Sequence, residues 1–132
     1  MLTVKIEENY DALIQKFGIE KADGMYVMAM RDSDLLMGIG VVRIHGVFAS
    51  LDNIIMTDDF KSFDLEFGMG KSLLNFLDLR GIRNVVTNIN DERLVTALRF
   101  KSAKENKDNV EFIGEWKYSL NLDGYFLSKC EK

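Results

Sequence analysis

The sequence has few of the residues on which several classes of protein depend. Among its 132 residues it contains one cysteine, Cys130, one histidine, His45, and no proline. One cysteine cannot form a disulfide framework within the chain, and no cluster of cysteine and histidine has the spacing of zinc ligands. His45 stands beside Gly46, which is more typical of a turn residue than of a metal ligand. We therefore expect neither a disulfide-stabilised fold nor a metal site.

Long hydrophobic runs and an excess of positive charge are also missing. No apolar run approaches the roughly 18 residues needed to cross a bilayer, and the N-terminus lacks the residue order of a signal peptide. The chain has 21 acidic and 17 basic residues, a formal net charge of -4. Without a basic run there is no electrostatic footprint for nucleic acid. These absences predict a cytoplasmic protein with neither a membrane nor a nucleic acid as partner.

What is present indicates one folded domain over residues 1–132. Hydrophobic residues make up 47% and charged residues 29% of the chain, a balance typical of a globular protein. After a short apolar start, Tyr10, Leu13 and Phe17 recur at helical spacing, and Gly18 ends the helix. Residues 26–30, 35–44 and 47–56 have the texture of strands, with polar or glycine-containing turns between them. Three antiparallel strands in meander order are expected.

A second helix is expected beyond Gly70, because residues 73–77 carry a broad apolar stripe that ends at Arg80 and Gly81. The β-branched segment 84–89 then predicts a buried strand, parallel to the one before the helix. We expect Asn90 to cap a third helix. Residues 101–109 are polar throughout, which predicts a frayed helix end and a loop. Residues 110–122 and 125–127 have the alternation of a closing two-stranded hairpin.

The stretch FGMGKSLLNFL, residues 67–77, places two glycines and a Lys-Ser pair where this second helix is expected to start. Unpaired amide groups at a helix start bind phosphate readily, and glycines leave the approach clear. The plainer alternative is that Gly68 and Gly70 only permit a sharp entry into the helix. A P-loop would need glycine at position 65, and a dinucleotide fingerprint would need it at position 73, but both are leucine.

The order of elements and these residues resemble the GNAT superfamily of N-acetyltransferases from about Met25 onward. That family places a hairpin and a fourth strand before a loop of the form Arg/Gln-x-x-Gly-x-Gly/Ala, followed by a helix, a fifth strand and an Asn-started helix. Here Leu65 to Gly70 occupies the loop motif, Asn53 to Met56 resembles the end of the fourth strand, and Asn90 follows the fifth. The resemblance implies an α+β fold with a mixed, mostly antiparallel central sheet flanked by helices.

The resemblance also implies acetyl-CoA as cofactor and a set of residues that would bind it. The fourth and fifth strands would diverge, and the acyl thioester would lie in the opening. Backbone groups of the fourth strand would pair with the pantetheine arm, and amides at the helix start would hold the diphosphate of coenzyme A. The implied cofactor-binding residues are Ile54, Ile55, Met56, Phe67, Gly68, Met69, Gly70, Lys71, Ser72 and Asn90.

The chain departs from the family pattern in three places. Leu65 replaces the motif's Arg or Gln, residues 57–67 form a segment about four residues longer than usual, and Ala97 and Leu98 stand where many members carry an acid tyrosine. Asp52 is the candidate base and Tyr118 and Tyr125 are candidate proton donors. A solvated strand carboxylate and aromatic residues that cover a core are the plainer alternatives for these three positions.

Two functions follow as hypotheses. The first is an acetyl-CoA-dependent N-acetyltransferase that acts by direct transfer on a primary amine of a small molecule or peptide. The second is a GNAT-fold module without catalysis that binds acyl-CoA or another protein. A nucleotide-binding role for Gly70-Lys71-Ser72 is disfavoured by Leu65. The acceptor and the choice between monomer and homodimer stay open.

Overall fold

The computed structural model describes residues 1–105 and 115–126. Its elements follow the chain in the order strand, helix, three strands, helix, strand, helix and two short strands. They are β1 (Leu2–Glu7), α1 (Asp11–Lys16), β2 (Met25–Asp32), β3 (Leu35–Ile44), β4 (Phe48–Met56), η1 (Asp58–Phe60), α2 (Phe63–Leu79), β5 (Asn84–Thr87), α3 (Glu92–Ala97), β6 (Lys101–Ser102), η2 (Ala103–Glu105) and β7 (Tyr118–Asn121).

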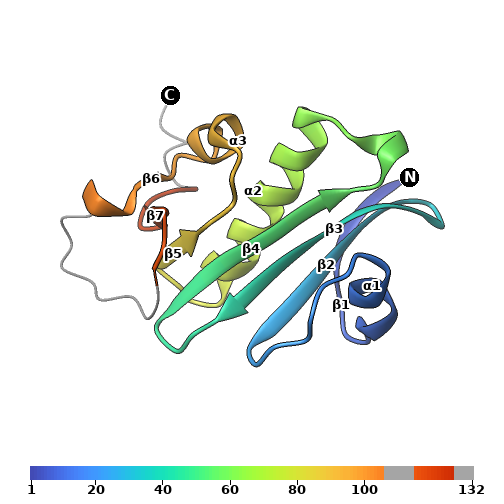
Figure 1. Ribbon diagram of the computed structural model, residues 1–132, viewed down its shortest axis with the longest axis horizontal. Coiled ribbons are helices and arrows are strands. Elements are labelled where there is room, and N and C mark those ends of the chain that lie inside the picture. Colours follow the sequence, from blue (N-terminus) through green and yellow to red (C-terminus); the bar gives the residue numbers. More distant parts are fainter. Residues whose placement is uncertain (106–114, 127–132) are drawn as a thin grey trace.

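The strands form one seven-stranded sheet in the order β1-β2-β3-β4-β5-β7-β6 (Figure 1). Every neighbouring pair is antiparallel except β4 and β5, which are parallel and joined through α2. The predicted α+β class, the three-strand meander and the parallel crossover are therefore confirmed. β1 was predicted only as an apolar start, and it pairs with β2 as an edge strand.

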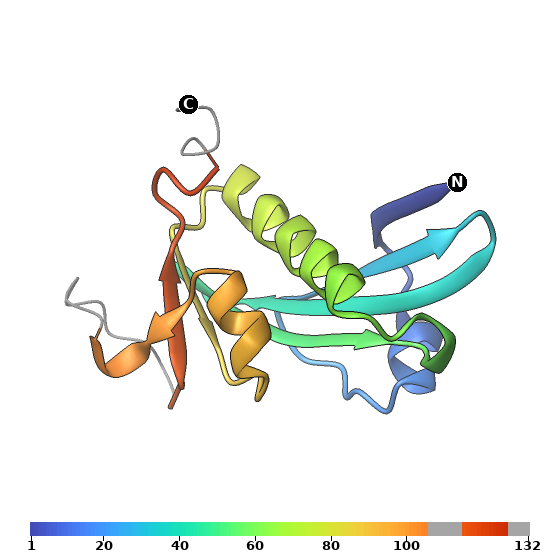
Figure 2. The same ribbon diagram turned by 90° about the horizontal axis from the view of Figure 1, so that it is seen from above.

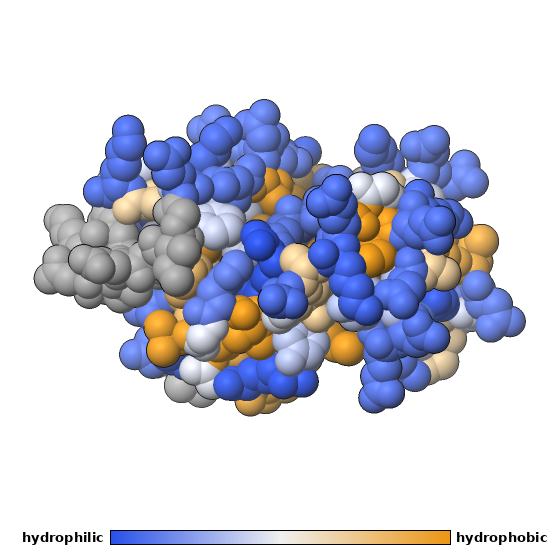
Figure 3. Space-filling view, turned by 60° about the horizontal axis from the view of Figure 1, so that its bottom comes forward, coloured by the Kyte–Doolittle hydropathy of each residue, from blue (hydrophilic) through white to orange (hydrophobic). Residues whose placement is uncertain are grey.

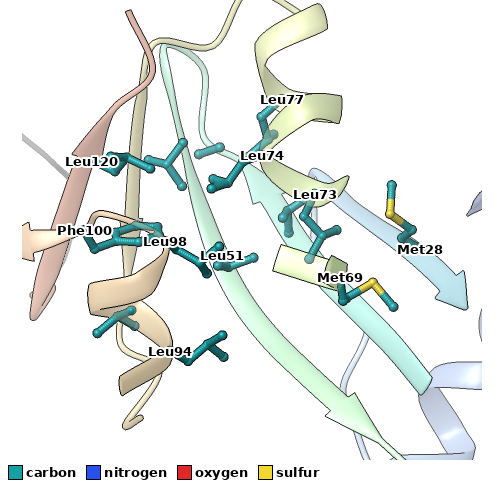
Figure 4. Close-up of a cluster of buried hydrophobic side chains, with 14 of the residues drawn as sticks. Met28, Leu51, Met69, Leu73, Leu74, Leu77, Leu94, Leu98, Phe100 and Leu120 are labelled. Carbon is teal, nitrogen blue, oxygen red and sulfur yellow. The ribbon is translucent and has the colours of Figure 1, made fainter. Parts of the chain in front are cut away.

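The sheet has two unlike sides. α2 lies on one side and α1 on the other (Figures 1 and 2). On the α2 side, leucines of the helix pack between the sheet and α3 in the main core, and Leu73, Leu74 and Leu77 are fully buried (Figure 4). On the α1 side, Ile14 packs with buried residues of β2 and β3 in a smaller hydrophobic cluster. The two clusters fix the helices to opposite faces.

A close approach of α2 to the sheet depends on Gly40 in β3. A Cβ atom built there would lie 2.5 Å from Leu73 Cδ1 and 3.0 Å from Met69 Cγ. A side chain at this position would force Leu73 and Met69 to shift, so the glycine allows this close packing of α2 on the sheet.

The C-terminal part of the chain differs from the predicted hairpin. β7 pairs with β5 on one side and with β6 on the other. Tyr125 and Phe126 form a turn instead of the returning strand, and Lys101 and Ser102, predicted as loop, are β6. The hairpin prediction is thus wrong for the described residues, because β5 supplies a longer partner for β7. Residues 110–114 and 127 of that prediction lie outside the described part of the chain.

The surface is mostly polar. Figure 3 shows one face on which hydrophilic residues surround smaller apolar patches. The large hydrophobic residues that are exposed include Leu35, Val47 and Leu79, which come from separate elements. In the described residues, no helix is long and apolar enough to span a membrane.

Candidate functional site

β4 and β5 pair for four residues and then part. Their parallel register runs from Phe48 opposite Asn84 to Leu51 opposite Thr87 and ends there. The Thr87 hydroxyl donates to the Leu51 carbonyl at 2.7 Å and accepts from the Ile89 amide at 3.1 Å. This buried side chain therefore links the two strands at their last paired position, which fixes where the pairing ends. β5 ends at Thr87 while β4 continues to Met56, so the second half of β4 has no β5 partner, as the implied opening requires.

Beyond that point β4 is paired along one edge only. Residues 53–56 pair with β3, with Ile54 opposite Gly40 and Met56 opposite Gly38. No strand in the described part of the chain pairs with their other edge. Ile54 and Ile55 are half-buried and Met56 is buried. This open edge provides backbone donors and acceptors where the resemblance implies an amide-bearing ligand.

A β-bulge marks the change between the two halves of β4. Val41 lies opposite Asn53 and Val42 opposite Leu51, so Asp52 is the extra residue. Its carboxylate accepts hydrogen bonds from Arg43, through Nε and, at 3.4 Å, through Nη2. The Arg43 and Asp52 side chains are 32% and 16% exposed. Asp52 was predicted from the sequence but Arg43 was not, because their contact depends on the hairpin register.

This ion pair lines a cavity of about 440 Å³ on the sheet face that α1 partly covers. The lining residues come from the α1–β2 loop, the β3–β4 hairpin and the ends of β5 and β7, and they are Ile19, Glu20, Lys21, Ala22, Met25, Arg43, Asp52, Asn53, Asn88 and Trp116. Since Asp52 and Asn88 directly follow Leu51 and Thr87, the last paired residues of β4 and β5, the cavity opens where that pairing ends. We call it the Asp52 pocket.

One wall of the Asp52 pocket is held by Asn88. Its side-chain Nδ2 donates to the Glu115 carbonyl at 2.9 Å, and its Oδ1 accepts from the Lys117 amide at 2.8 Å. These two bonds fix Trp116, which lies between the bonded residues, against the end of β5. Trp116 is the single tryptophan of the chain, so its fluorescence reports on this pocket.

His45 lies next to this wall. Its Nε2 is 2.8 Å from the buried Ser50 hydroxyl, and its ring stacks on Phe48 with centroids 4.9 Å apart. Burial and then the charge of Arg43 lower the pKa of His45, while Asp52 partly opposes them. The imidazole is therefore neutral at neutral pH, and its contact with Ser50 was not predicted from the sequence.

The helix start lies earlier than the glycine stretch predicted. α2 begins at Phe63, and the Ser62 hydroxyl caps it by accepting from the Leu65 amide at 3.1 Å. Gly68 and Gly70 are inside the helix, so the prediction of a start after Gly70 is wrong. An α-helix pairs each amide with the carbonyl four residues earlier. The amides of Phe67, Gly68, Met69, Gly70, Lys71 and Ser72 are thus used within α2 and are not free donors in this conformation.

The side chains of the glycine stretch have structural contacts. A Cβ at Gly70 would lie 2.7 Å from Leu98 Cδ1, so this glycine lets α2 and α3 approach. Lys71 Nζ lies 4.5 Å from the centroid of the Tyr125 ring, and the Ser72 hydroxyl donates to the Gly68 carbonyl at 2.9 Å. Gly70 and Lys71 thus connect α2 to its neighbours, whereas the Ser72 hydroxyl bonds within the helix.

The actual start of α2 is acidic. Asp64 and Glu66 lie in its first turn, and Asp58 and Asp59 lie just before it in η1. Burial, followed by the nearby Asp91, raises the pKa of Glu66, and Lys61 opposes the shift. Carboxylates at a helix N-terminus stabilise the helix, but they repel a phosphate from the same place.

The two tyrosine candidates occupy different surroundings. Tyr125 is buried, its hydroxyl donates to the Leu98 carbonyl at 2.9 Å, and burial raises its pKa, which Arg99 partly opposes. That phenol is committed to the core, which matches the plainer alternative. Tyr118 is half-buried and lies opposite Thr87, beside the separation of β4 and β5. Of the two tyrosines, only Tyr118 is close to the opening between β4 and β5.

Asn90 is exposed and lies one residue before the cap of α3. The cap is Asp91, whose carboxylate accepts from the Leu94 amide at 3.1 Å. The prediction that Asn90 caps this helix is therefore wrong by one residue, since Asp91 directly precedes the helix and its carboxylate accepts from the free Leu94 amide. Among the described residues, no group of His, Cys, Asp and Glu side chains could hold a metal ion.

Comparisons with known proteins show that the fold is that of the GNAT superfamily. No family model and no curated sequence matches the chain. The structure is similar to that of the ribosomal-protein-S18-alanine N-acetyltransferase from Escherichia coli, at 14% identity and a TM-score of 0.65, covering 92% of this chain and 91% of that one. It is also similar to a GNAT family acetyltransferase from Elizabethkingia anophelis with acetyl-CoA bound, at 11% identity and a TM-score of 0.57, covering 91% and 94%. A third similar structure is an acetyltransferase of the GNAT family from Staphylococcus aureus, at 9% identity and a TM-score of 0.58, covering 91% and 99%.

Proposed function

We propose that the protein is an acetyl-CoA-dependent N-acetyltransferase that acts on a primary amine by direct transfer. The observation that supports this most is the separation of β4 and β5 at Thr87, with the Asp52 pocket opening at the same point. A thioester in that opening would meet an amine entering through the pocket. Similar structures with acetyl-CoA or coenzyme A bound support the choice of cofactor.

The open edge of β4 fits a cofactor arm that carries amide groups. In this proposal, backbone groups of Ile54, Ile55 and Met56 pair with the arm. Asn90, exposed between β5 and α3, would contact the cofactor from the other side. The diphosphate would lie at the start of α2, near the amides of Phe63 and Asp64, instead of at residues 67–72. The acidic residues around that start fit a diphosphate poorly, so we expect weak cofactor binding.

The chain offers three groups for the transfer step. Acetyl-CoA supplies a thioester carbonyl. In the transfer, a bond forms between the amine nitrogen and the carbonyl carbon, and the C–S bond of the thioester breaks. The amine loses a proton and the sulfur of coenzyme A gains one. Asp52 would accept the proton, directly or through water, because it lines the pocket beside Asn53. A backbone amide near Met56 would polarise the carbonyl, and Tyr118 is the candidate that returns a proton to sulfur.

Thiol release tests this proposal. The protein is incubated with acetyl-CoA and a panel of primary amines, and free coenzyme A is measured against a reaction without amine. Amine-dependent release supports the proposal, and a panel that gives no release above background at millimolar acetyl-CoA contradicts it.

A GNAT-fold module without catalysis is the second candidate, and the acidic start of α2 favours it. Four carboxylates lie in η1 and the first turn of α2, the segment where a diphosphate would bind. Ala97 and Leu98 carry no hydroxyl at the positions where the family has an acid tyrosine. Calorimetry with acetyl-CoA separates the two candidates when it is combined with thiol release. Binding without release favours an acyl-CoA-binding module, and the absence of binding at millimolar ligand favours a protein-interaction module.

A further inference from the structure

The Arg43–Asp52 ion pair leaves polar atoms available to a ligand. Arg43 uses Nε and Nη2 toward Asp52, so the two N–H groups of Nη1 have no partner among the described residues. The Asp52 carboxylate accepts only from Arg43 within that part of the chain, which leaves lone pairs on both oxygens. Both side chains are partly exposed in the same pocket. The Asp52 carboxylate can therefore bind a cationic group of a ligand, and the Arg43 guanidinium can bind an anionic group.

The other charged residues of the pocket, Lys21 and Glu20, do not compete with Arg43 and Asp52 for a ligand. Lys21 is held by the Asp11 carboxylate at 3.2 Å and lies over the Tyr10 ring, 5.4 Å from its centroid. Glu20 is exposed at the side of the pocket formed by the α1–β2 loop. The partly buried centre therefore consists of one guanidinium and one carboxylate, an arrangement with no net charge.

The shape of the pocket matches a small ligand with an apolar side chain. Ile19, Ala22 and Met25 form an apolar wall beside the ion pair. The volume of about 440 Å³ exceeds what one amino acid of medium size needs and leaves little room for a folded peptide segment.

We propose that the acceptor is a small amino acid, with its amino group at Asp52 and its carboxylate at Arg43. This inference rests on the proposed function, because it places the amino group at the opening between β4 and β5. The products would be an N-acetyl amino acid and free coenzyme A. Arg43 is then the residue that selects the substrate class, while Asp52 faces the reacting nitrogen.

The test compares three ligands that share one side chain. Leucine carries a carboxylate, leucinamide carries a neutral amide in its place, and isopentylamine carries neither. Each is titrated into the protein while Trp116 fluorescence is recorded, with calorimetry as a second measurement. Charge-assisted hydrogen bonds are about twice as strong as neutral ones, so leucine is expected to bind at least about tenfold more tightly than the other two.

Two variants locate the preference. Arg43→Gln is expected to reduce the advantage of leucine to less than about threefold, because it removes the guanidinium. Arg31→Gln is the matched control, since Arg31 is 31% exposed and pairs with Glu7 on the same sheet, outside the pocket. It should leave the advantage unchanged. If thermal melting shows that Arg43→Gln does not fold, the three-ligand comparison on the unmodified protein still decides.

Several results would overturn the inference. They are equal binding of isopentylamine and leucine, an unchanged preference in Arg43→Gln, equal binding of a leucine-glycine dipeptide, or no binding of any ligand by either method. Thiol release distinguishes this failure from failure of the proposed function. If leucine binds through its carboxylate but no thiol is released, the amino acid site stands and the transferase function is contradicted. If leucine and isopentylamine give equal thiol release, the transferase function stands and the amino acid site is contradicted.

Discussion

The two sides of the sheet differ in chemistry, although the same strands supply both. On the α2 side, β4 contributes Ala49, Leu51 and Met56 to an apolar core that α2 and α3 close. On the opposite side it contributes Ser50 and Asp52, which contact His45 and Arg43. The bulge at Asp52 is where the strand also loses its β5 partner. Stability and the proposed chemistry are therefore assigned to opposite faces, and substitutions can separate them.

The largest effect is expected from Leu73→Ala on the α2 side. Leu73 is fully buried and packs against the sheet where Gly40 has no side chain. Loss of a buried leucine leaves a cavity, so we expect the free energy of unfolding to fall by about 2–5 kcal/mol. Denaturant titration followed by circular dichroism measures it. A loss below about 1 kcal/mol would mean that this side is not the principal core.

On the opposite side, Asp52→Asn should reduce activity rather than stability. Without a base, kcat/KM for acetyl transfer is expected to fall by about 100-fold or more, while the melting temperature changes far less than in Leu73→Ala. Asp78→Asn is the control, since Asp78 also pairs with an arginine, Arg83, and is 24% exposed. Equal rates in Asp52→Asn and the unmodified protein would remove Asp52 from the mechanism.

A smaller effect, on the affinity for coenzyme A, is expected from the acidic residues at the start of α2. Asp64→Asn combined with Glu66→Gln removes two carboxylates from the first turn. We expect coenzyme A to bind about tenfold more tightly at low salt, since each nearby exposed charge contributes about 1 kcal/mol or less. Calorimetry at two salt concentrations measures this. Unchanged affinity would place the diphosphate elsewhere.

The smallest effect distinguishes the two glycines of α2. A Cβ at Gly68 meets nothing within 4 Å, so Gly68→Ala should stabilise the protein by about 0.5–1 kcal/mol through helix propensity. Gly70→Ala should gain less or lose stability, because its Cβ would press on Leu98. Thermal melting of both variants is the measurement. An equal gain in both would mean that α2 and α3 do not approach closely at Gly70.

Much of the fold could be predicted because its signals are local. Alternation of apolar residues located β2, β3 and β4, and glycine stops such as Gly18 and Gly81, both with positive φ, located the ends of α1 and α2. The early start of α2 also had a local signal. Ser62 is a capping residue, and Phe63 and Phe67 follow at helical spacing, but the polar residues between them and the glycines after them favoured a loop.

The site could be predicted only in part because it depends on contacts between distant elements. The opening of β4 and β5 followed from the order of elements, and Asp52 followed from its place on a strand. Arg43 and Trp116 reach the pocket through strand register and the bonds of Asn88, which no sequence spacing encodes. Tyr125 was a candidate proton donor by residue type alone, and it is buried with Lys71 and Arg99 over its ring, as the plainer alternative of core packing expects.

The central claim is that the pantetheine arm of acetyl-CoA binds along the open edge of β4. Hydrogen exchange of individual amides, measured by NMR with and without saturating acetyl-CoA, tests it most directly. We predict that exchange slows at residues 53–56 and at Phe63 and Asp64, with no change at residues 67–72, which α2 already protects. Unaltered exchange along β4, together with slowing elsewhere or nowhere, would contradict the account.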